Sequence, residues 1–172
     1  MIIYDADIGA LSERSKRVYD KLLSRKKIPP QAHVENLADV PTEPVLELRL
    51  QELETDPHWL RARIEGRLIE GENYDHELSK ILLYGDEVIG VALICRKTKT
   101  GILYDSAVIK EGWRNSWANA LLKYKVFSHL HEAGFTSCYS VALPCYPDPH
   151  GLARSVDAKI FKRYAKLNIK LN

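Results

Sequence analysis

A strand that runs through a short turn directly into a helix, at residues 107–122, is the feature that most constrains the fold of this chain. The segment reads AVIKEGWRNSWANALL, and a helix is predicted to begin near Ser116. One buried helix face is indicated by apolar residues at three- and four-residue spacing: Ala118, Leu121, Leu122, Val126, Leu130 and Ala133. The first N–H groups of such a helix lack partners within it and, with the helix dipole, favour an anion. The segment therefore raises the question of whether this turn binds a phosphate or pyrophosphate.

Composition narrows the class of protein. With 172 residues, 45% of them hydrophobic and 28% charged, the chain can form one domain with a sizeable core and a short appendage. A net charge of +2 gives no overall reason to expect nucleic acid. No apolar run is long enough to span a membrane, and the N-terminal segment MIIYDADIGALSERSKR carries acids where a signal peptide needs an apolar core. Cys95, Cys138 and Cys145 lack metal-ligand spacing and indicate reduced thiols, so we expect a soluble cytoplasmic protein without a metal site.

Residues 1–44 differ from the rest of the chain and are expected to form an N-terminal helix and a linker arm. Ser12 can cap a helix that ends near Lys26, and several prolines punctuate the polar segment that follows. The helix, residues 12–27, has a basic face made of Arg14, Lys16, Arg17, Lys21, Arg25, Lys26 and Lys27. This face could contact nucleic acid or an acidic protein surface. The alternative, which charge runs of this size more often represent, is a solvated helix face.

From residue 45 onwards the pattern is that of one compact domain, residues 45–172. It begins with VLELRLQEL, whose alternation of apolar and polar residues predicts a half-buried strand or the start of a helix. A helix is then expected from Asp56-Pro57 to about residue 71. Strands are expected at 80–84, 88–96 and 102–109. The turn GDE joins the first two of them, so the sequence predicts an antiparallel meander that leads into the strand–turn–helix segment.

The last third of the chain is predicted to add a parallel strand. Gly134 suits the left-handed residue that ends the central helix, and a strand at 136–143 follows it. Because a helix joins this strand to the preceding one, the two should lie parallel. After a Pro-rich loop we expect a last helix at 152–166 and a short strand at 168–172, which could pair across a homodimer. Together the elements predict an α/β fold (α+β, three layers) with a mixed, mostly antiparallel sheet of about six to seven strands and helices on both faces.

Four stretches carry a resemblance to a known family. The hairpin GDEVIGVALI contains a Val/Ile-Gly pair, the central helix ends in HEAGF, and the segment YAKLNI stands at residues 164–169. The central segment can be laid without gaps on a signature of a valine, a short turn, Arg/Gln-x-x-Gly-x-Gly/Ala and paired leucines. Val108 then stands at the valine, Trp113 at the Arg/Gln, and Ser116 and Ala118 at the two small positions. The chain therefore resembles the GCN5-related N-acetyltransferase (GNAT) superfamily, which implies an acyl-CoA N-acyltransferase-like fold.

The resemblance implies acetyl-CoA or another acyl-CoA as cofactor and an amine as substrate. It places Tyr164 at the family's general-acid tyrosine, although Tyr164 also suits a half-buried position on the last helix, and it places Asp157 where many members have asparagine. Asp105 lies on the strand that lines the family's cleft, where it is either the general base or a solvated strand-edge carboxylate. Tyr104 faces the other side of the sheet, so at most one of the two can serve. The cofactor-binding segment implied by the resemblance comprises Ala107, Val108, Ile109, Trp113, Arg114, Asn115, Ser116, Trp117 and Ala118.

Three positions depart from the family pattern. Trp113 replaces the Arg/Gln, Ser116 replaces the first glycine, and Asn168 replaces a glycine near the end. The glycines allow the backbone to approach a pyrophosphate, and serine adds only a small side chain. Tryptophan cannot donate to a phosphate as arginine does, but Lys110 and Arg114 lie alongside and could make charge-assisted contacts. The bulky turn is also similar in style to that of divergent bacteriophage members of the superfamily.

Three functional hypotheses follow from the sequence. The first is an acyl-CoA-dependent N-acyltransferase, with acetyl-CoA the first choice. The second is a catalytically silent protein that uses the same fold to bind a protein or to occupy an assembly such as a virion. The third has the basic helix at residues 12–27 contacting nucleic acid. His129 and His131 do not face each other on their helix, and the cysteines lack a His–acid partner, so no metal site or thiol nucleophile is expected.

Overall fold

Seven strands form one sheet in the computed structural model, which describes residues 2–50, 74–114, 117–142 and 147–163. The strand order is β2-β3-β4-β5-β6-β1-β7. The strands are β1 (Ile2–Asp7), β2 (Ala32–Asn36), β3 (Lys80–Tyr84), β4 (Glu87–Arg96), β5 (Gly101–Ile109), β6 (Ser137–Ala142) and β7 (Lys159–Arg163). Within the described residues β5 and β6 pair in parallel, and the other neighbouring pairs are antiparallel. This confirms the prediction of a mixed, mostly antiparallel sheet.

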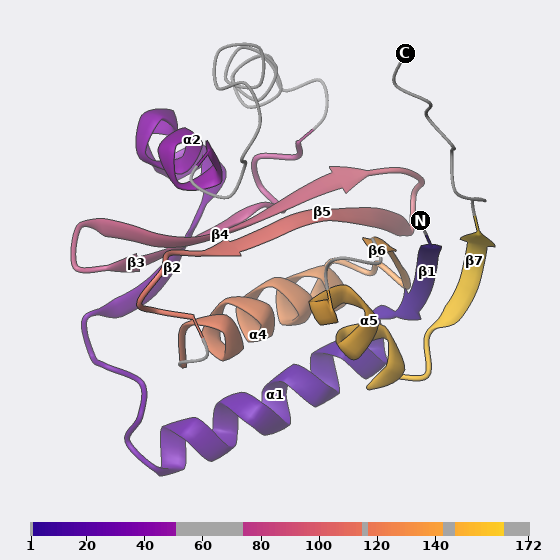
Figure 1. Ribbon diagram of the computed structural model, residues 1–172, viewed down its shortest axis with the longest axis horizontal. Coiled ribbons are helices and arrows are strands. Elements are labelled where there is room, and N and C mark those ends of the chain that lie inside the picture. Colours follow the sequence, from indigo (N-terminus) through magenta and orange to yellow (C-terminus); the bar gives the residue numbers. More distant parts are fainter. Residues whose placement is uncertain (1, 51–73, 115–116, 143–146, 164–172) are drawn as a thin grey trace, which may run out of the picture.

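Helices cover both faces of this sheet (Figure 1). On one face lie α1 (Ile8–Ser24) and α4 (Trp117–Glu132), and on the other lies α2 (Thr42–Leu50), which follows the short 3-10 helix η1 (Leu37–Asp39). A further helix, α5 (Pro147–Arg154), connects β6 to β7. None of the helices in the described part of the chain is long and apolar enough to cross a membrane. The prediction of helices on both faces is confirmed.

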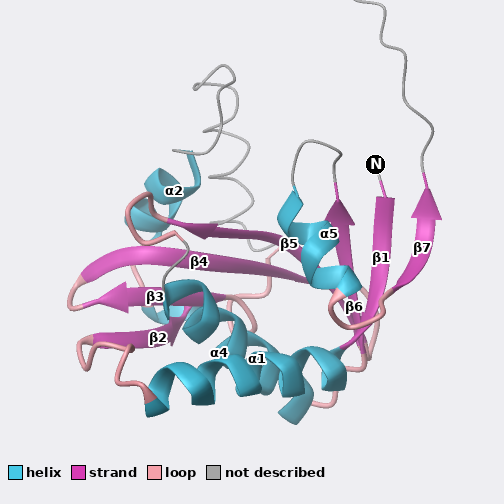
Figure 2. Cartoon of the chain, turned by 60° about the horizontal axis from the view of Figure 1, so that its bottom comes forward, coloured by secondary structure: helices cyan, strands magenta, loops and turns pink. Residues whose placement is uncertain are grey.

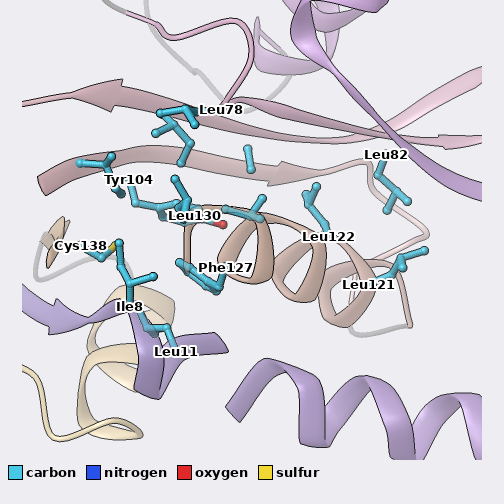
Figure 3. Close-up of a cluster of buried hydrophobic side chains, with 14 of the residues drawn as sticks. Ile8, Leu11, Leu78, Leu82, Tyr104, Leu121, Leu122, Phe127, Leu130 and Cys138 are labelled. Atoms are coloured by element: carbon cyan, nitrogen blue, oxygen red, sulfur yellow. The ribbon is translucent and has the colours of Figure 1, made fainter. Parts of the chain in front are cut away.

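Two hydrophobic cores result, one on each face. The larger core lies between the sheet and helices α1 and α4, and we call it the α4-side core. It includes the fully buried Phe127, Leu122 and Ile8 (Figure 3). The smaller one, the α2-side core, packs Val45 and Leu46 of α2 against the other face of the sheet. Because β4 contributes to both cores, it is apolar along most of its length, as its sequence EVIGVALICR shows. The segment VLELRLQEL, for which strand and helix were both considered, thus contributes a helix as far as Leu50.

Residues 2–44 contribute two strands of the sheet and part of the core, which corrects the expectation of an N-terminal arm. Strand β1 pairs with both β6 and β7, and β2 pairs with β3. Tyr19 of α1 stacks on Tyr124 of α4 with ring centroids 4.3 Å apart. Helix α1 also begins earlier than predicted, because the Asp7 carboxylate accepts a hydrogen bond from the Ala10 N–H at 2.8 Å and caps the helix there, which leaves Ser12 inside it.

The last predicted helix, 152–166, is also corrected. Helix α5 ends at Arg154, Asp157 has a positive φ of 50°, and β7 begins at Lys159. The apolar spacing that suggested one continuous helix arises because Ala153 packs inward from α5 whereas Ile160 lies opposite Tyr4 of the neighbouring strand. The helix expected at 56–71 and the strand expected at 168–172 lie outside the described residues.

The predictions around the middle of the chain are confirmed. The hairpin of β3 and β4 and the third strand β5 have nearly the expected bounds. Helix α4 is followed by Gly134 with a φ of 83°, which is the left-handed conformation expected after the helix end. Strand β6 then lies parallel to β5, as the β–α–β connection requires.

Candidate functional site

The sheet opens between its two parallel strands. Residues 101–104 of β5 pair with residues 137–140 of β6, and the two strands do not pair with each other beyond these four positions. From there on β5 pairs only with β4, on its other side, and β6 pairs only with β1, on its other side, within the described residues. Figure 2 shows β5 and β6 running apart from this point. One side of β5 from Asp105 onwards therefore has no strand beside it in the described residues.

A β-bulge at Asp105 accounts for this divergence. On β4, the consecutive residues Leu93 and Ile94 pair with Ser106 and Tyr104. Asp105 is therefore an extra residue of β5 that has no pairing partner on β4. A bulge bends its strand and increases the local twist, which turns the end of β5 away from β6.

The side chains of Asp105 and Tyr104 lie on opposite faces of the sheet, as alternation along a strand requires. Asp105 is partly exposed, and its Oδ2 accepts a hydrogen bond of 2.6 Å from the hydroxyl of the buried Tyr74, which belongs to the α2-side core. Tyr104 packs into the α4-side core with its ring 5.5 Å from that of Phe127. Burial raises the pKa of the Tyr104 phenol well above its usual range, so this group stays protonated. Of the two residues, Asp105 is the one that can accept a proton.

Backbone groups near the end of β5 face the open side. The Lys110 N–H donates to the Ile89 carbonyl of β4 at 2.9 Å. Because successive residues of a strand direct their N–H groups to alternate sides, those of Ala107 and Ile109 face away from β4. The Ile109 carbonyl on that side accepts a hydrogen bond of 3.2 Å from Nε of Arg114. The open side of β5 is thus bordered by main-chain donors and by the guanidinium of Arg114.

The turn after β5 is compact and partly open. The Trp113 N–H donates to the Lys110 carbonyl at 3.0 Å, and Gly112 adopts a φ of 86° that favours glycine. Apart from the two chain neighbours of Gly112, no atom of the described residues lies within 4 Å of the position where a Cβ on this glycine would stand. The ammonium of Lys110 pairs with Glu87 of β4. Asn115 and Ser116 lie outside the described residues.

The side chain of Trp113 is held in an aromatic cluster. Its ring lies 4.9 Å from that of Tyr84 on β3 and 5.6 Å from that of Trp117 in the first turn of α4. Trp113 and Trp117 also pack against the α4-side core. The large residue at the family's Arg/Gln position therefore joins the turn to β3.

The remaining predicted residues differ in their surroundings. Ala107 is exposed, Val108 is buried in the α2-side core, and Ala118 is fully buried in the α4-side core. Asp157 lies in the turn between α5 and β7. Tyr164, the predicted general acid, lies outside the described residues. The structure therefore brings Asp105, the end of β5 and the start of α4 to one region, while the role of Tyr164 stays a prediction.

A pocket of about 470 Å³ lies between α1, α4 and α5. Helix α1 contributes Leu11, Arg14, Ser15, Val18 and Leu22, helix α4 contributes Asn119, Ala120, Lys123 and Phe127, and the segment at α5 contributes Gly151, Leu152 and Ser155. Asn119 and Ala120 belong to the first turn of α4, so the pocket extends to the start of this helix. We call it the three-helix pocket.

Sequence reasoning missed two parts of this region. Tyr74 has no local signal, because only the fold brings it to Asp105. Arg14 was recognised within the basic run, but as part of a surface for a macromolecule or of a solvated helix face, and not as part of a pocket. Burial raises the pKa of the Cys138 thiol to about 12, so this thiol stays protonated at neutral pH.

Comparison with known proteins identifies the fold. No protein-family model and no curated protein matches the sequence. Among solved structures, aminoglycoside acetyltransferase AAC(6')-Iy, in complex with a bisubstrate analogue of CoA, aligns with a TM-score of 0.59 at 12% identity over 78% of this chain and 95% of its own. The aminoglycoside acetyltransferase meta-AAC0020 from an uncultured soil metagenomic sample, in complex with sisomicin, gives 0.55 at 14% identity over 83% and 97%.

A third similar structure, a GCN5-related N-acetyltransferase from Sphaerobacter thermophilus, gives a TM-score of 0.55 at 18% identity over 77% of this chain and 42% of its own. At such identities the likeness shows the fold alone.

Proposed function

We propose that this chain, which has the fold of the GCN5-related N-acetyltransferases, is an acyl-CoA-dependent N-acyltransferase that acts on an amine. One observation carries the proposal: β5 leaves β6 at the Asp105 bulge, immediately before the turn that leads into α4. A carboxylate, outward main-chain N–H groups and a helix start thereby meet at one opening of the sheet. Acyl transfer to an amine needs such groups to accept a proton and to stabilise an oxyanion.

The residues present fit coenzyme A. The N–H groups of Ala107 and Ile109 border the open side of β5, where they can donate to the pantetheine arm and the thioester carbonyl. The first N–H groups of α4 suit a pyrophosphate. The Trp113 side chain is held against Tyr84, and a side chain at Gly112 would meet open space among the described residues. When bound, the cofactor supplies an acyl group activated as a thioester, and acetyl-CoA is the first candidate.

Asp105 is proposed as the general base. An amine substrate is mostly protonated at neutral pH, so a carboxylate at the opening attracts it and can accept its proton, directly or through water. The hydrogen bond from Tyr74 fixes one oxygen of the carboxylate and leaves the other for the substrate. From the family resemblance, the hydroxyl of Tyr164 is proposed as the proton donor at the end of the reaction, and Asp157 as a residue beside the cofactor.

Substitution of Asp105 tests this function. In an assay that detects the free thiol released from acetyl-CoA in the presence of a panel of amines, we expect the wild type to be active with at least one amine. Asp105→Asn should lower the rate about 100-fold or more, while the dissociation constant for coenzyme A stays within about 3-fold. Asp86→Asn, in the exposed β3–β4 turn, is the matched control and should behave as the wild type. An Asp105→Asn variant with an undiminished rate would remove Asp105 from the mechanism.

A second candidate function rests on the basic residues of α1. The basic residues of α1 and of the segment after it are solvent-exposed, and they are Arg14, Lys16, Arg17, Lys21, Arg25, Lys26 and Lys27. A surface of this kind could contact nucleic acid, in which case the affinity should fall steeply as salt concentration rises. A gel-shift titration at two salt concentrations tests this function, and an affinity for nucleic acid that does not change with salt concentration would contradict it. The silent-protein alternative and the likeness to bacteriophage members stay predictions.

A further inference from the structure

We propose that Arg14 of α1 and Lys123 of α4 bind the 3′-phosphate of coenzyme A in the three-helix pocket, so that the N-terminal helix selects coenzyme A over its 3′-dephospho form. The inference rests on the proposed function, because it assigns the nucleotide end of the same cofactor.

The position of the pocket carries the first step. Asn119 and Ala120 lie in the first turn of α4 and also line the pocket. From there the lining continues along α4 through Lys123 to Phe127. A ligand whose pyrophosphate lies at the start of α4 therefore has this pocket next to it for the group that follows. In coenzyme A that group is an adenosine with a 3′-phosphate.

The chemistry of the lining carries the second step. Five lining side chains are large and apolar, namely Leu11, Val18, Leu22, Phe127 and Leu152. Two are cationic, and no carboxylate occurs among the residues that line the pocket in the described part of the chain. Apolar walls suit the faces of a purine ring, and paired cations suit a phosphate. A volume of about 470 Å³ is sufficient for one nucleotide.

The hydroxyl groups of the lining leave the recognition of a phosphate to the cations. The Ser15 hydroxyl donates to the Leu11 carbonyl at 2.7 Å, and the Ser155 hydroxyl donates to the Leu152 carbonyl at 2.6 Å. Each serine is thus turned towards its own helix or turn. Arg14 presents a planar guanidinium that can donate two parallel hydrogen bonds to phosphate oxygens.

The wall formed by α1 is fixed by the fold. Strand β1, which precedes α1 directly, lies between β6 and β7, and Tyr19 stacks on Tyr124 of α4. Leu11 is buried between α1 and the core, whereas Val18 is 44% exposed at the pocket. Arg14 therefore stands on a helix whose position does not depend on the ligand.

Isothermal titration calorimetry with three probes tests the inference: coenzyme A, 3′-dephospho-coenzyme A and adenosine 3′,5′-bisphosphate. The wild type should bind coenzyme A at least 10-fold more tightly than the dephospho form and should bind the bisphosphate measurably. Arg14→Met and Lys123→Met, which retain an unbranched stem, should each weaken coenzyme A about 10-fold or more and leave the dephospho form nearly unchanged. Arg17→Met, exposed on the same helix but outside the pocket, is the matched control and should bind as the wild type.

The outcomes separate the inference from the proposed function. Equal affinity of the wild type for coenzyme A and its dephospho form overturns the inference and leaves the proposed function standing. No binding of coenzyme A overturns both. Discrimination that persists undiminished in both Met variants also overturns the inference. The comparison of the two cofactors in the wild type needs no variant, so a variant that fails to fold does not affect it.

Discussion

Asp105 owes its place to one extra residue in β5. Without the bulge the strand would continue beside β6, and the carboxylate would lie at an ordinary position of a closed sheet. With the bulge, the carboxylate accepts a hydrogen bond from the Tyr74 hydroxyl and remains partly exposed. The sequence placed Asp105 on this strand correctly, but a bulge has no local signature here. Its partner Tyr74 comes from a segment 31 positions earlier, so only the fold could bring the two together.

Removal of the Tyr74 hydroxyl is the prediction at this scale. Tyr74→Phe deletes a hydrogen bond to a charged acceptor and should lower the free energy of unfolding by about 1–3 kcal/mol in urea denaturation. Because the bond joins Tyr74 to Asp105, the double variant with Asp105→Asn should be less destabilised than the sum of the single variants. Strictly additive effects would show that the two side chains do not interact energetically.

Trp113 shows how a residue that departs from a family pattern is explained by its neighbours. The sequence indicated only that tryptophan cannot replace an arginine at a phosphate. The structure places its ring against Tyr84 and Trp117, an arrangement that depends on β3 lying beside the turn. The position of the Trp113 indole therefore depends on Tyr84, which lies 29 positions earlier in the sequence.

At the scale of elements, the C-terminal half of α4 meets the beginning of β3 in a polar cluster. The buried Lys80 donates from Nζ to the Asn36 Oδ1 at 2.5 Å and to the Glu77 carbonyl at 2.9 Å. Burial, and then the positive charge of Lys80, hold the pKa of His129 below its usual range. The acidic groups that face His129, Glu132, Glu77 and Asp75, act in the opposite direction.

A pH dependence of stability follows from His129. Its folded-state pKa is lowered, so near pH 6.5 and somewhat below the unfolded chain binds more protons than the folded one. Its contribution to stability is therefore complete above about pH 7 and is lost as the pH falls through the pKa of the folded state. The free energy of unfolding should drop between pH 7.5 and pH 5.5, and His129→Gln should reduce this drop. His131→Gln, exposed in the last turn of the same helix, is the control. An equal drop in both variants and the wild type would exclude His129 as the cause.

The sequence predicted some elements well and others poorly for physical reasons. The hairpin and α4 were predicted because turn residues and apolar periodicity are local signals. Strand β1 was missed because six residues, of which two are acidic, give a weak pattern without their partners β6 and β7. Strand β7 was read as helix because Ala153, Val156 and Ile160 happen to have helical spacing.

At the scale of the whole molecule, we expect residues 2–44 to unfold together with the sheet to which they contribute two strands. Ile8, at the start of α1, is fully buried in the α4-side core, whereas Leu23 of the same helix is 51% exposed. Ile8→Ala should lower the global free energy of unfolding by about 2–5 kcal/mol, and Leu23→Ala by less than about 1 kcal/mol. Both variants can be compared by urea denaturation followed through tryptophan fluorescence, because all three tryptophans lie outside residues 1–44. If the N-terminal residues formed a separate arm, Ile8→Ala would leave this transition unchanged.

The central claim, that the opening between β5 and β6 holds coenzyme A, is tested most directly by thermal unfolding with and without the free cofactor. A ligand at 100 times its dissociation constant stabilises the folded state by about 2.7 kcal/mol, which for a chain of this size corresponds to a rise in Tm of about 5–10 °C. We predict a rise of this size that saturates as coenzyme A is added. An unchanged Tm at millimolar coenzyme A would contradict the claim.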